Sequence, residues 1–121
     1  MSTRFSWSGR LASFRHAFNG LRTLLVEEHN ARLHLAATLA VVILATLLDL
    51  PPLEWALLLL AIALVWLAEA LNSALEALAD AVHPEQHPMI GKAKDLGAGA
   101  VLVTACCAAL IGLLVFVPYL F

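Results

Sequence analysis

Three long apolar stretches dominate the chain, and their lengths predict helices that span a membrane. They cover residues 31–50, 53–82 and 95–121. The hydrocarbon core of a bilayer is about 30 Å thick, which an α-helix crosses in about 20 residues. The second stretch would be about 45 Å long as a helix, so we expect it to tilt or to protrude from the membrane.

Prolines separate these stretches from one another. Asp49, Pro51 and Pro52 end the first, and Pro84 and Pro88 lie in the loop after the second. A proline has no N–H to donate within a helix, and its ring collides with the preceding turn. The pattern therefore predicts three separate spans.

A further helix is predicted over residues 5–28, before the first span. Its large apolar residues recur every three or four positions and so share one face: Trp7, Leu11, Phe14, Phe18, Leu21 and Leu25. His16 and Asn19 lie opposite. Such a helix suits the membrane surface, with its aromatic face at the boundary of the acyl chains. A helix that binds a soluble partner is the alternative.

Composition agrees with an all-α membrane protein of one domain, residues 1–121. Of the 121 residues, 62% are hydrophobic and 13% charged, whereas a soluble domain carries about 25% charged residues. The net charge of −2 gives no basic field for nucleic acid. Residues 1–20 lack the continuous apolar run of a secretory signal, so we expect the first span to be an uncleaved anchor.

The basic residues predict the orientation in the membrane. They lie before the first span, at its very start, or between the second and third spans: Arg4, Arg10, Arg15, Arg22, Arg32, Lys92 and Lys94. Cytoplasmic loops carry an excess of lysine and arginine. We therefore expect the N-terminus in the cytoplasm and the C-terminus outside.

The second span carries a polar face near its cytoplasmic end. On a helix, the following residues fall within about 60–100° of one another: Glu69, Asn72, Ser73, Glu76 and Asp80. An acidic residue at the centre of a membrane helix costs about 2.5–3.5 kcal/mol. The face therefore needs a cation, a metal ion or another polar helix beside it, and a role limited to holding helices together is the alternative.

Depth gives the two glutamates of this face different tasks. Measured from Leu53, Glu69 lies about 24 Å along the helix and Glu76 about 35 Å. Glu69 is then just inside the hydrocarbon boundary, where it can act as a general base toward a buried hydroxyl. Glu76 is at the aqueous edge, where a carboxylate can hold a hard cation. This arrangement predicts phosphoryl transfer to an alcohol embedded in the membrane.

Two residues outside this span fit the same reaction. Glu28 ends the surface helix and is a candidate second metal ligand, with solvation of a helix end as the alternative. Lys94 can neutralise phosphate charge, with anchoring at the membrane surface as the alternative. His83 and His87 have the spacing of a zinc pair, but we expect the intervening prolines to keep them apart. The sequence has no G-x-x-x-x-G-K-[ST] phosphate loop and no protein-kinase signature.

Taken together, these motifs resemble a known family. Residues 69–76, Glu-Ala-Leu-Asn-Ser-Ala-Leu-Glu, followed by Asp80, are similar to the signature of the small bacterial diacylglycerol kinase and undecaprenol kinase family. Residues 92–102, Gly20-Leu21-Arg22 and Glu28 extend the match along nearly the whole chain. The combination is far more specific than any of its parts.

The resemblance implies a homotrimer in the bacterial inner membrane, with active sites shared between neighbouring subunits. It implies Mg²⁺ with ATP as the phosphoryl donor, Glu69 as the catalytic base, and Glu28 and Glu76 as metal ligands. Nucleotide or phosphate contacts are implied for Asn72, Glu85, Gln86, His87, Lys94 and Asp95.

We expect the lipid acceptor to lie at Glu69, among Phe18, Arg22, Leu25, Arg32 and His34. Residues 28–34 look more like the undecaprenol kinase branch, so we favour undecaprenol, which gives undecaprenyl phosphate. Diacylglycerol, which gives phosphatidic acid, is the alternative acceptor. A non-enzymatic transporter or channel, or a scaffold subunit, is the alternative class. A proton or cation pathway should cross the bilayer, whereas the polar groups here gather at one end.

Overall fold

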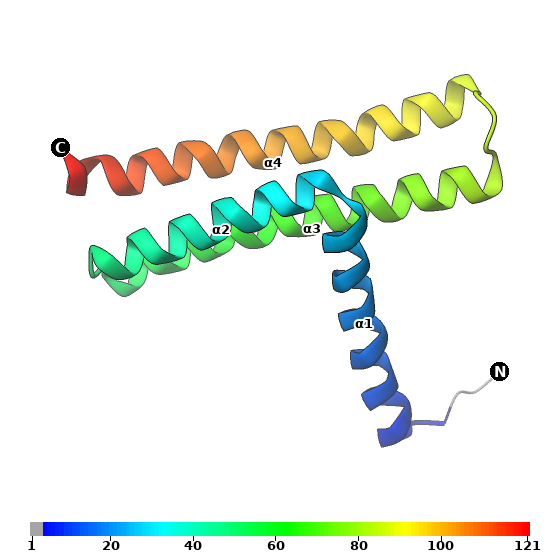
Figure 1. Ribbon diagram of the computed structural model, residues 1–121, viewed down its shortest axis with the longest axis horizontal. Coiled ribbons are helices and arrows are strands. Elements are labelled where there is room, and N and C mark those ends of the chain that lie inside the picture. The colour runs from blue at the N-terminus through cyan, green and yellow to red at the C-terminus, as the bar shows by residue number, and fades with distance from the viewer. Residues whose placement is uncertain (1–3) are drawn as a thin grey trace.

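The computed structural model describes residues 4–121, and this part of the chain forms four helices (Figure 1). They are α1 (Trp7–Glu27), α2 (His29–Leu47), α3 (Pro52–Val82) and α4 (Pro88–Leu120). The predicted all-α fold is confirmed. The last three helices are long and apolar enough to cross a membrane, so the chain is a multi-pass membrane protein.

Helix α3 is the centre of the structure. Helix α4 packs along it and α2 lies against it, whereas α1 runs across the direction of the other three (Figure 1). The hydrophobic core lies where α2 ends, α3 begins and α4 ends; its buried members are Ala45, Leu50, Leu58, Val115 and Phe116. The polar face of α3 lies toward the opposite end of the helix, away from this core.

A compact turn joins α2 to α3. The amide of Leu50 donates to the carbonyl of Ala45, and that of Asp49 donates to the carbonyl of Thr46. This pattern is a Schellman motif, with Asp49 at a φ of 52° in the position that glycine usually takes. Pro52 then occupies the first turn of α3, where a missing N–H costs nothing. Local sequence thus ends one helix and starts the next.

Helix α4 begins earlier than we expected. The third span was expected over residues 95–121, but the helix starts at Pro88, and Lys94 and Asp95 are helical. Proline is well suited to a first helical turn. The amide of Met89 donates to Nδ1 of His87, which caps the helix end. A proline that ends one helix in the sequence pattern therefore starts another in the structure.

Large apolar side chains cover most of the outer surface of the helices. Leu60 is 62% exposed and Leu114 is 77% exposed. The apolar face of α1 is equally open, with Phe18 at 68%. Exposed apolar surface on this scale marks contact with lipid or with other membrane helices.

The chain bends between α1 and α2 at Glu28, where φ is −104° and ψ is 119°. Arg32, one turn into α2, reaches back across the bend. Its Nε donates to the carbonyl of Leu25 at 3.0 Å, and its Nη2 donates to the carbonyl of Val26. A cation at carbonyls that end a helix is favourable because both the hydrogen bonds and the helix dipole are satisfied. Arg32 thereby fixes the angle between α1 and the spans.

Replacing Arg32 by Gln should loosen this bend. We expect the free energy of local opening to fall by about 1 kcal/mol. Amide hydrogen exchange around residues 25–30 should then be roughly fivefold faster. The exposed Arg15 on α1 provides the matched control Arg15→Gln. Equal exchange rates at the bend in both variants would show that Arg32 does not hold it.

The closest approach of α4 to α3 is at Gly97. A Cβ atom placed there would collide with Oδ1 of Asn72 and lie 3.1 Å from Cδ2 of Leu75. At Gly99, two residues further along α4, a Cβ atom meets nothing within 4 Å. The lack of a side chain is thus needed at Gly97 and not at Gly99.

The two glycines therefore form a matched pair for substitution. Gly97→Ala should destabilise the protein by about 1–3 kcal/mol, because the side chains of Asn72 and Leu75 must shift to make room. Gly99→Ala should stabilise it by about 0.5–1 kcal/mol, because alanine favours the helix. Thermal unfolding in detergent measures both, and a Gly97→Ala variant that melts at or above the wild-type temperature would contradict the close contact.

Candidate active site

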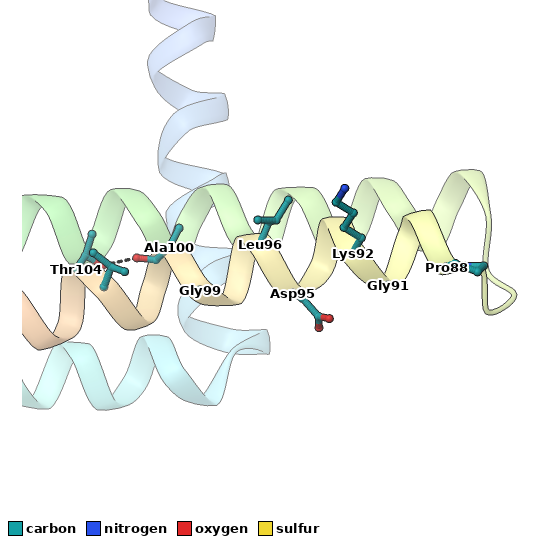
Figure 2. A pocket seen from close by; sticks show the side chains of 9 residues that line it. Pro88, Gly91, Lys92, Asp95, Leu96, Gly99, Ala100 and Thr104 are labelled. Atoms are coloured by element: carbon teal, nitrogen blue, oxygen red, sulfur yellow. Dashed lines mark hydrogen bonds between the residues drawn. The ribbon is translucent and has the colours of Figure 1, made fainter.

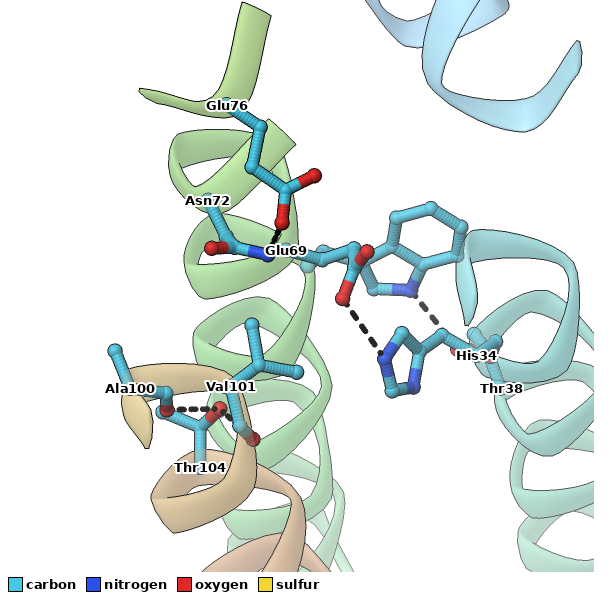
Figure 3. Close-up of polar contacts among 9 residues, drawn as sticks. His34, Thr38, Glu69, Asn72, Glu76, Ala100, Val101 and Thr104 are labelled. Carbon is cyan, nitrogen blue, oxygen red and sulfur yellow. Dashed lines mark hydrogen bonds and ion pairs between the residues drawn. The ribbon is translucent and has the colours of Figure 1, made fainter. Parts of the chain in front are cut away.

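Glu69 on α3 is the one buried ionisable side chain among residues 4–121, with 1% of its surface exposed. Its Oε2 lies 3.4 Å from Nε2 of His34 on α2 (Figure 3). The two atoms are close enough for an ion pair, but neither has a hydrogen-bond partner of good geometry in the described part of the chain. A buried carboxylate without a hydrogen bond is costly, so this pair is the most unusual polar feature of the protein.

Two residues hold the His34 ring in place. The indole of Trp66 lies edge-on to the imidazole, with ring centroids 6.5 Å apart. Trp66 Nε1 donates to the hydroxyl of Thr38 at 3.0 Å, and that hydroxyl donates to the carbonyl of His34 at 2.7 Å (Figure 3). These contacts join α2 to α3 directly beside Glu69.

The next turn of α3 carries the rest of the polar face. Asn72 Nδ2 donates to Oε1 of Glu76 at 3.5 Å (Figure 3). Oδ1 of Asn72 and Oγ of Ser73 are buried and have no partner within residues 4–121. Oδ1 of Asn72 lies against Gly97 of α4, whereas Ser73 lines a cavity between α1 and α3.

A cavity of about 580 Å³ lies between α1 and α3 and gathers the acidic residues. Its polar lining residues are Thr23, Glu27, Glu28, Ser73, Glu76 and Asp80. The structure therefore brings the two predicted metal ligands, Glu28 and Glu76, to one cavity. Carboxylate and hydroxyl oxygens are the donors that a hard cation such as Mg²⁺ prefers, so the lining fits that ion chemically.

The cavity does not contain a complete cage for a metal ion. Across residues 4–121, no three His, Cys, Asp or Glu side chains are close enough to hold one. Mg²⁺ is usually held by one or two carboxylates together with water and substrate phosphates. The donor set thus suits a cation that arrives with a nucleotide.

A second cavity, of about 560 Å³, lies at the loop between α3 and α4. It brings together four residues predicted to contact the nucleotide: Glu85, Gln86, His87 and Lys94. Lys94 Nζ also donates to Oδ1 of Asp80 at 2.6 Å, and Asp80 lines the first cavity. One ion pair therefore connects the two cavities across the α3–α4 contact.

Asp95 lies apart from these groups. It lines a hollow of about 900 Å³ along another face of α4, together with Lys92 and the small residues Gly91 and Gly99 (Figure 2). Lys94 lines the loop cavity instead and pairs with Asp80 on α3. Within this one chain, Asp95 is not brought to the other predicted nucleotide contacts.

An apolar groove of about 550 Å³ starts at His34 and extends to the end of α4. Helices α2, α3 and α4 all contribute to it, through residues that include Val41, Leu58, Ala61, Val65, Ala108 and Phe116. The groove has the dimensions and the lining of a site for hydrocarbon. Its polar end lies at His34, whose imidazole faces Glu69.

The residues predicted to contact the lipid are only partly brought together. His34 meets Glu69, whereas Phe18 and Arg22 are exposed on α1 and Leu25 is half-buried there. Arg32 is engaged with the end of α1. The lipid contacts of Phe18, Arg22, Leu25 and Arg32 stay predictions.

One expectation about the histidines is wrong. The prolines do not separate His83 from His87, because their ring centroids lie 5.3 Å apart. Nδ1 of His83 donates to the carbonyl of Glu85, and Nδ1 of His87 accepts from the amide of Met89. The His83 ring thus forms a hydrogen bond within the loop, and the His87 ring caps the start of α4.

Three residues of the site were not singled out from the sequence. Glu27 lines the acidic cavity, and Trp66 and Thr38 hold His34. A signal for Glu27 was present, because Ala17, Gly20, Leu24 and Glu27 follow the spacing of one helix face. Trp66 and Thr38 gave no such signal, since they lie in continuous apolar runs.

Known proteins resemble this chain over most of its length. The profile of the family described as prokaryotic diacylglycerol kinase matches residues 15–116. The undecaprenol kinase of Bacillus subtilis (strain 168) is 40% identical over 89% of this chain and 88% of its own length.

Two proteins named diacylglycerol kinase are also similar. That of Escherichia coli (strain K12) is 37% identical over 77% of this chain and 76% of its own length. That of Synechocystis is 38% identical over 89% of this chain and 62% of its own length. With this agreement along the chain, the protein belongs to the prokaryotic diacylglycerol kinase family and is a membrane lipid kinase, as its sequence predicted.

Proposed function

We propose that this lipid kinase transfers the γ-phosphoryl group of ATP to undecaprenol, with diacylglycerol as the alternative acceptor. The observation that carries the proposal is the position of Glu69. Its carboxylate is buried beside His34, which lines the polar end of an apolar groove, and Glu76, further along the same helix face, lines an acidic cavity. A hydroxyl at the end of a hydrocarbon chain and a water-borne triphosphate can meet there.

Glu69 acts as the general base in this proposal. The acceptor's hydrocarbon chain lies in the groove and its hydroxyl points at Oε2, which has no hydrogen bond within residues 4–121. Removal of the hydroxyl proton makes the oxygen a better nucleophile toward the γ-phosphorus. Burial keeps water, a competing acceptor, away from the carboxylate.

Glu28 and Glu76 hold Mg²⁺ together with the phosphates of ATP. The ion neutralises negative charge on the phosphoryl oxygens when it is bound. Asn72 orients Glu76 through its amide, and Lys94 faces the nucleotide from α4. Glu85, Gln86 and His87 contact the nucleotide from the loop that they share with Lys94.

Asp95 is assigned to a site shared between subunits of a homotrimer. Asp95 lines a different hollow from Glu85, Gln86, His87 and Lys94, which supports this assignment because a neighbouring subunit can approach the open face of α4 (Figure 2). The exposed apolar surface of the helices also leaves ample area for subunit contacts.

The positions of the charges support a place in the bacterial inner membrane with a cytoplasmic N-terminus. Arginine side chains precede α2, and Lys92 and Lys94 lie at the start of α4, all at the end that holds the two polar cavities. ATP is a cytoplasmic substrate, so the positive-inside rule and the location of these cavities agree. The exposed aromatic face of α1 then rests on the inner leaflet.

Undecaprenol is favoured over diacylglycerol because the Bacillus subtilis undecaprenol kinase aligns over most of both chains. His34, within residues 28–34 that resemble the undecaprenol kinase branch, also lies beside the base.

A panel of acceptors tests this assignment directly. Purified protein with labelled ATP and Mg²⁺ should phosphorylate undecaprenol in micelles faster than it phosphorylates diacylglycerol in matched micelles. Glu69→Gln should lower kcat by about 10²–10⁴-fold, because the amide cannot take a proton, while oligomer size stays unchanged by chromatography. Full activity in Glu69→Gln would overturn the assignment of the base.

A magnesium titration tests the proposed metal ligand. Glu76→Gln should raise the Mg²⁺ concentration needed for half-maximal rate by at least about tenfold, because a charged oxygen ligand is lost. Glu54→Gln is the matched control, since Glu54 lies at the opposite end of the same helix. An unchanged magnesium dependence in Glu76→Gln would remove Glu76 from the metal site.

A further inference from the structure

Glu69 and His34 lie side by side but differ in how far they are exposed to solvent. Only 1% of the Glu69 side chain is exposed, against 18% of the His34 side chain. A carboxylate that accepts a proton at each turnover must release that proton before the next one. Glu69 is buried and has no direct access to water, so a neighbouring group must take the proton from it.

We propose that His34 is a positioning residue that works with Glu69 as a carboxylate–imidazole pair. This proposal rests on the proposed function, since it assumes that Glu69 is the general base. With its ring proton on Nδ1, His34 presents the unprotonated Nε2 to Oε2 of Glu69 and takes there the proton that Glu69 has removed. The two atoms lie 3.4 Å apart, and neither makes a hydrogen bond to any group within residues 4–121, so both are free to enter this contact.

The proton and electrons balance without a further reactant. The acceptor oxygen forms a bond to the γ-phosphorus of ATP, and the bond from that phosphorus to the β–γ bridging oxygen breaks, leaving its electron pair on ADP. The hydroxyl proton passes to Oε2 of Glu69 and from there to Nε2 of His34. The imidazolium then loses its other ring proton, the one on Nδ1, to water and returns to a neutral form.

The surroundings of His34 suit this task better than a packing role. A histidine that serves only for packing normally has its ring nitrogens satisfied, whereas Nε2 of His34 is buried and unsatisfied among the described residues. Trp66 fixes the ring from the side, and Thr38 ties Trp66 to the backbone of His34. The ring is thus held by contacts that leave Nε2 free to face Glu69.

Two substitutions separate a proton acceptor from a hydrogen-bond donor. His34→Gln keeps a donor at about the position of Nε2 but cannot take a proton, and His34→Ala removes both abilities. The exposed His16 on α1 provides the control His16→Gln. The assay measures kcat and KM with the lipid alcohol that the wild-type protein phosphorylates best.

We expect kcat to fall by about 10–100-fold in both His34 variants. The KM for the lipid should stay within about threefold of wild type, because binding of the substrate is not the step affected. Added imidazole should restore part of the kcat of His34→Ala, because it can enter the space left by the ring. It should restore neither His34→Gln nor Glu69→Gln.

Other outcomes would overturn the proposal. A wild-type kcat in His34→Gln would show that a donor suffices and no proton is taken. A raised KM at unchanged kcat would make His34 a lipid contact, and failure of imidazole to restore a folded His34→Ala would exclude proton transfer. If His34→Ala does not fold, His34→Gln alone decides. Absence of lipid kinase activity in the wild-type protein would instead refute the proposed function.

Discussion

Keeping a carboxylate inside a membrane-spanning helix is costly, and much of this structure serves to hold Glu69 there in a useful state. Helix α2 must lie against α3 so that His34 faces the carboxylate at 3.4 Å. The Trp66–Thr38 hydrogen bond maintains that contact between the two helices. The remaining parts of the site, from Asn72 to the acidic cavity, are arranged along the same helix toward water.

The two ends of the bundle have different tasks. Apolar side chains around Leu58 and Phe116 pack the three spans together at one end. At the other end Gly97 lets α4 approach Asn72, and Arg32 turns α1 across the bundle so that Glu28 faces Glu76. Phosphoryl transfer between a lipid and a nucleotide needs such a division, because one substrate is in hydrocarbon and the other in water.

The sequence predicted most of the helices and the polar face of α3, because each rests on local patterns. The apolar stretches predicted the spans, and the spacing from Glu69 to Asp80 predicted the polar face of α3. The start of α4 was missed, because a proline reads equally well as a helix breaker and as a first helical residue. The pairing of Arg32 with the end of α1 was missed as well, because it depends on a bend that no periodicity records.

By itself, the sequence determined that this protein is a helical membrane protein of a lipid kinase family, since hydropathy, helical spacing and signature residues are properties of the chain alone. Only the tertiary structure decided that His34 is the partner of Glu69, that Glu27 joins Glu28 and Glu76 in one cavity, and that Asp95 faces elsewhere. The physical reason is that such contacts form between atoms of different helices. Their distances depend on how those helices cross and rotate, which the spacing of residues along one helix does not fix.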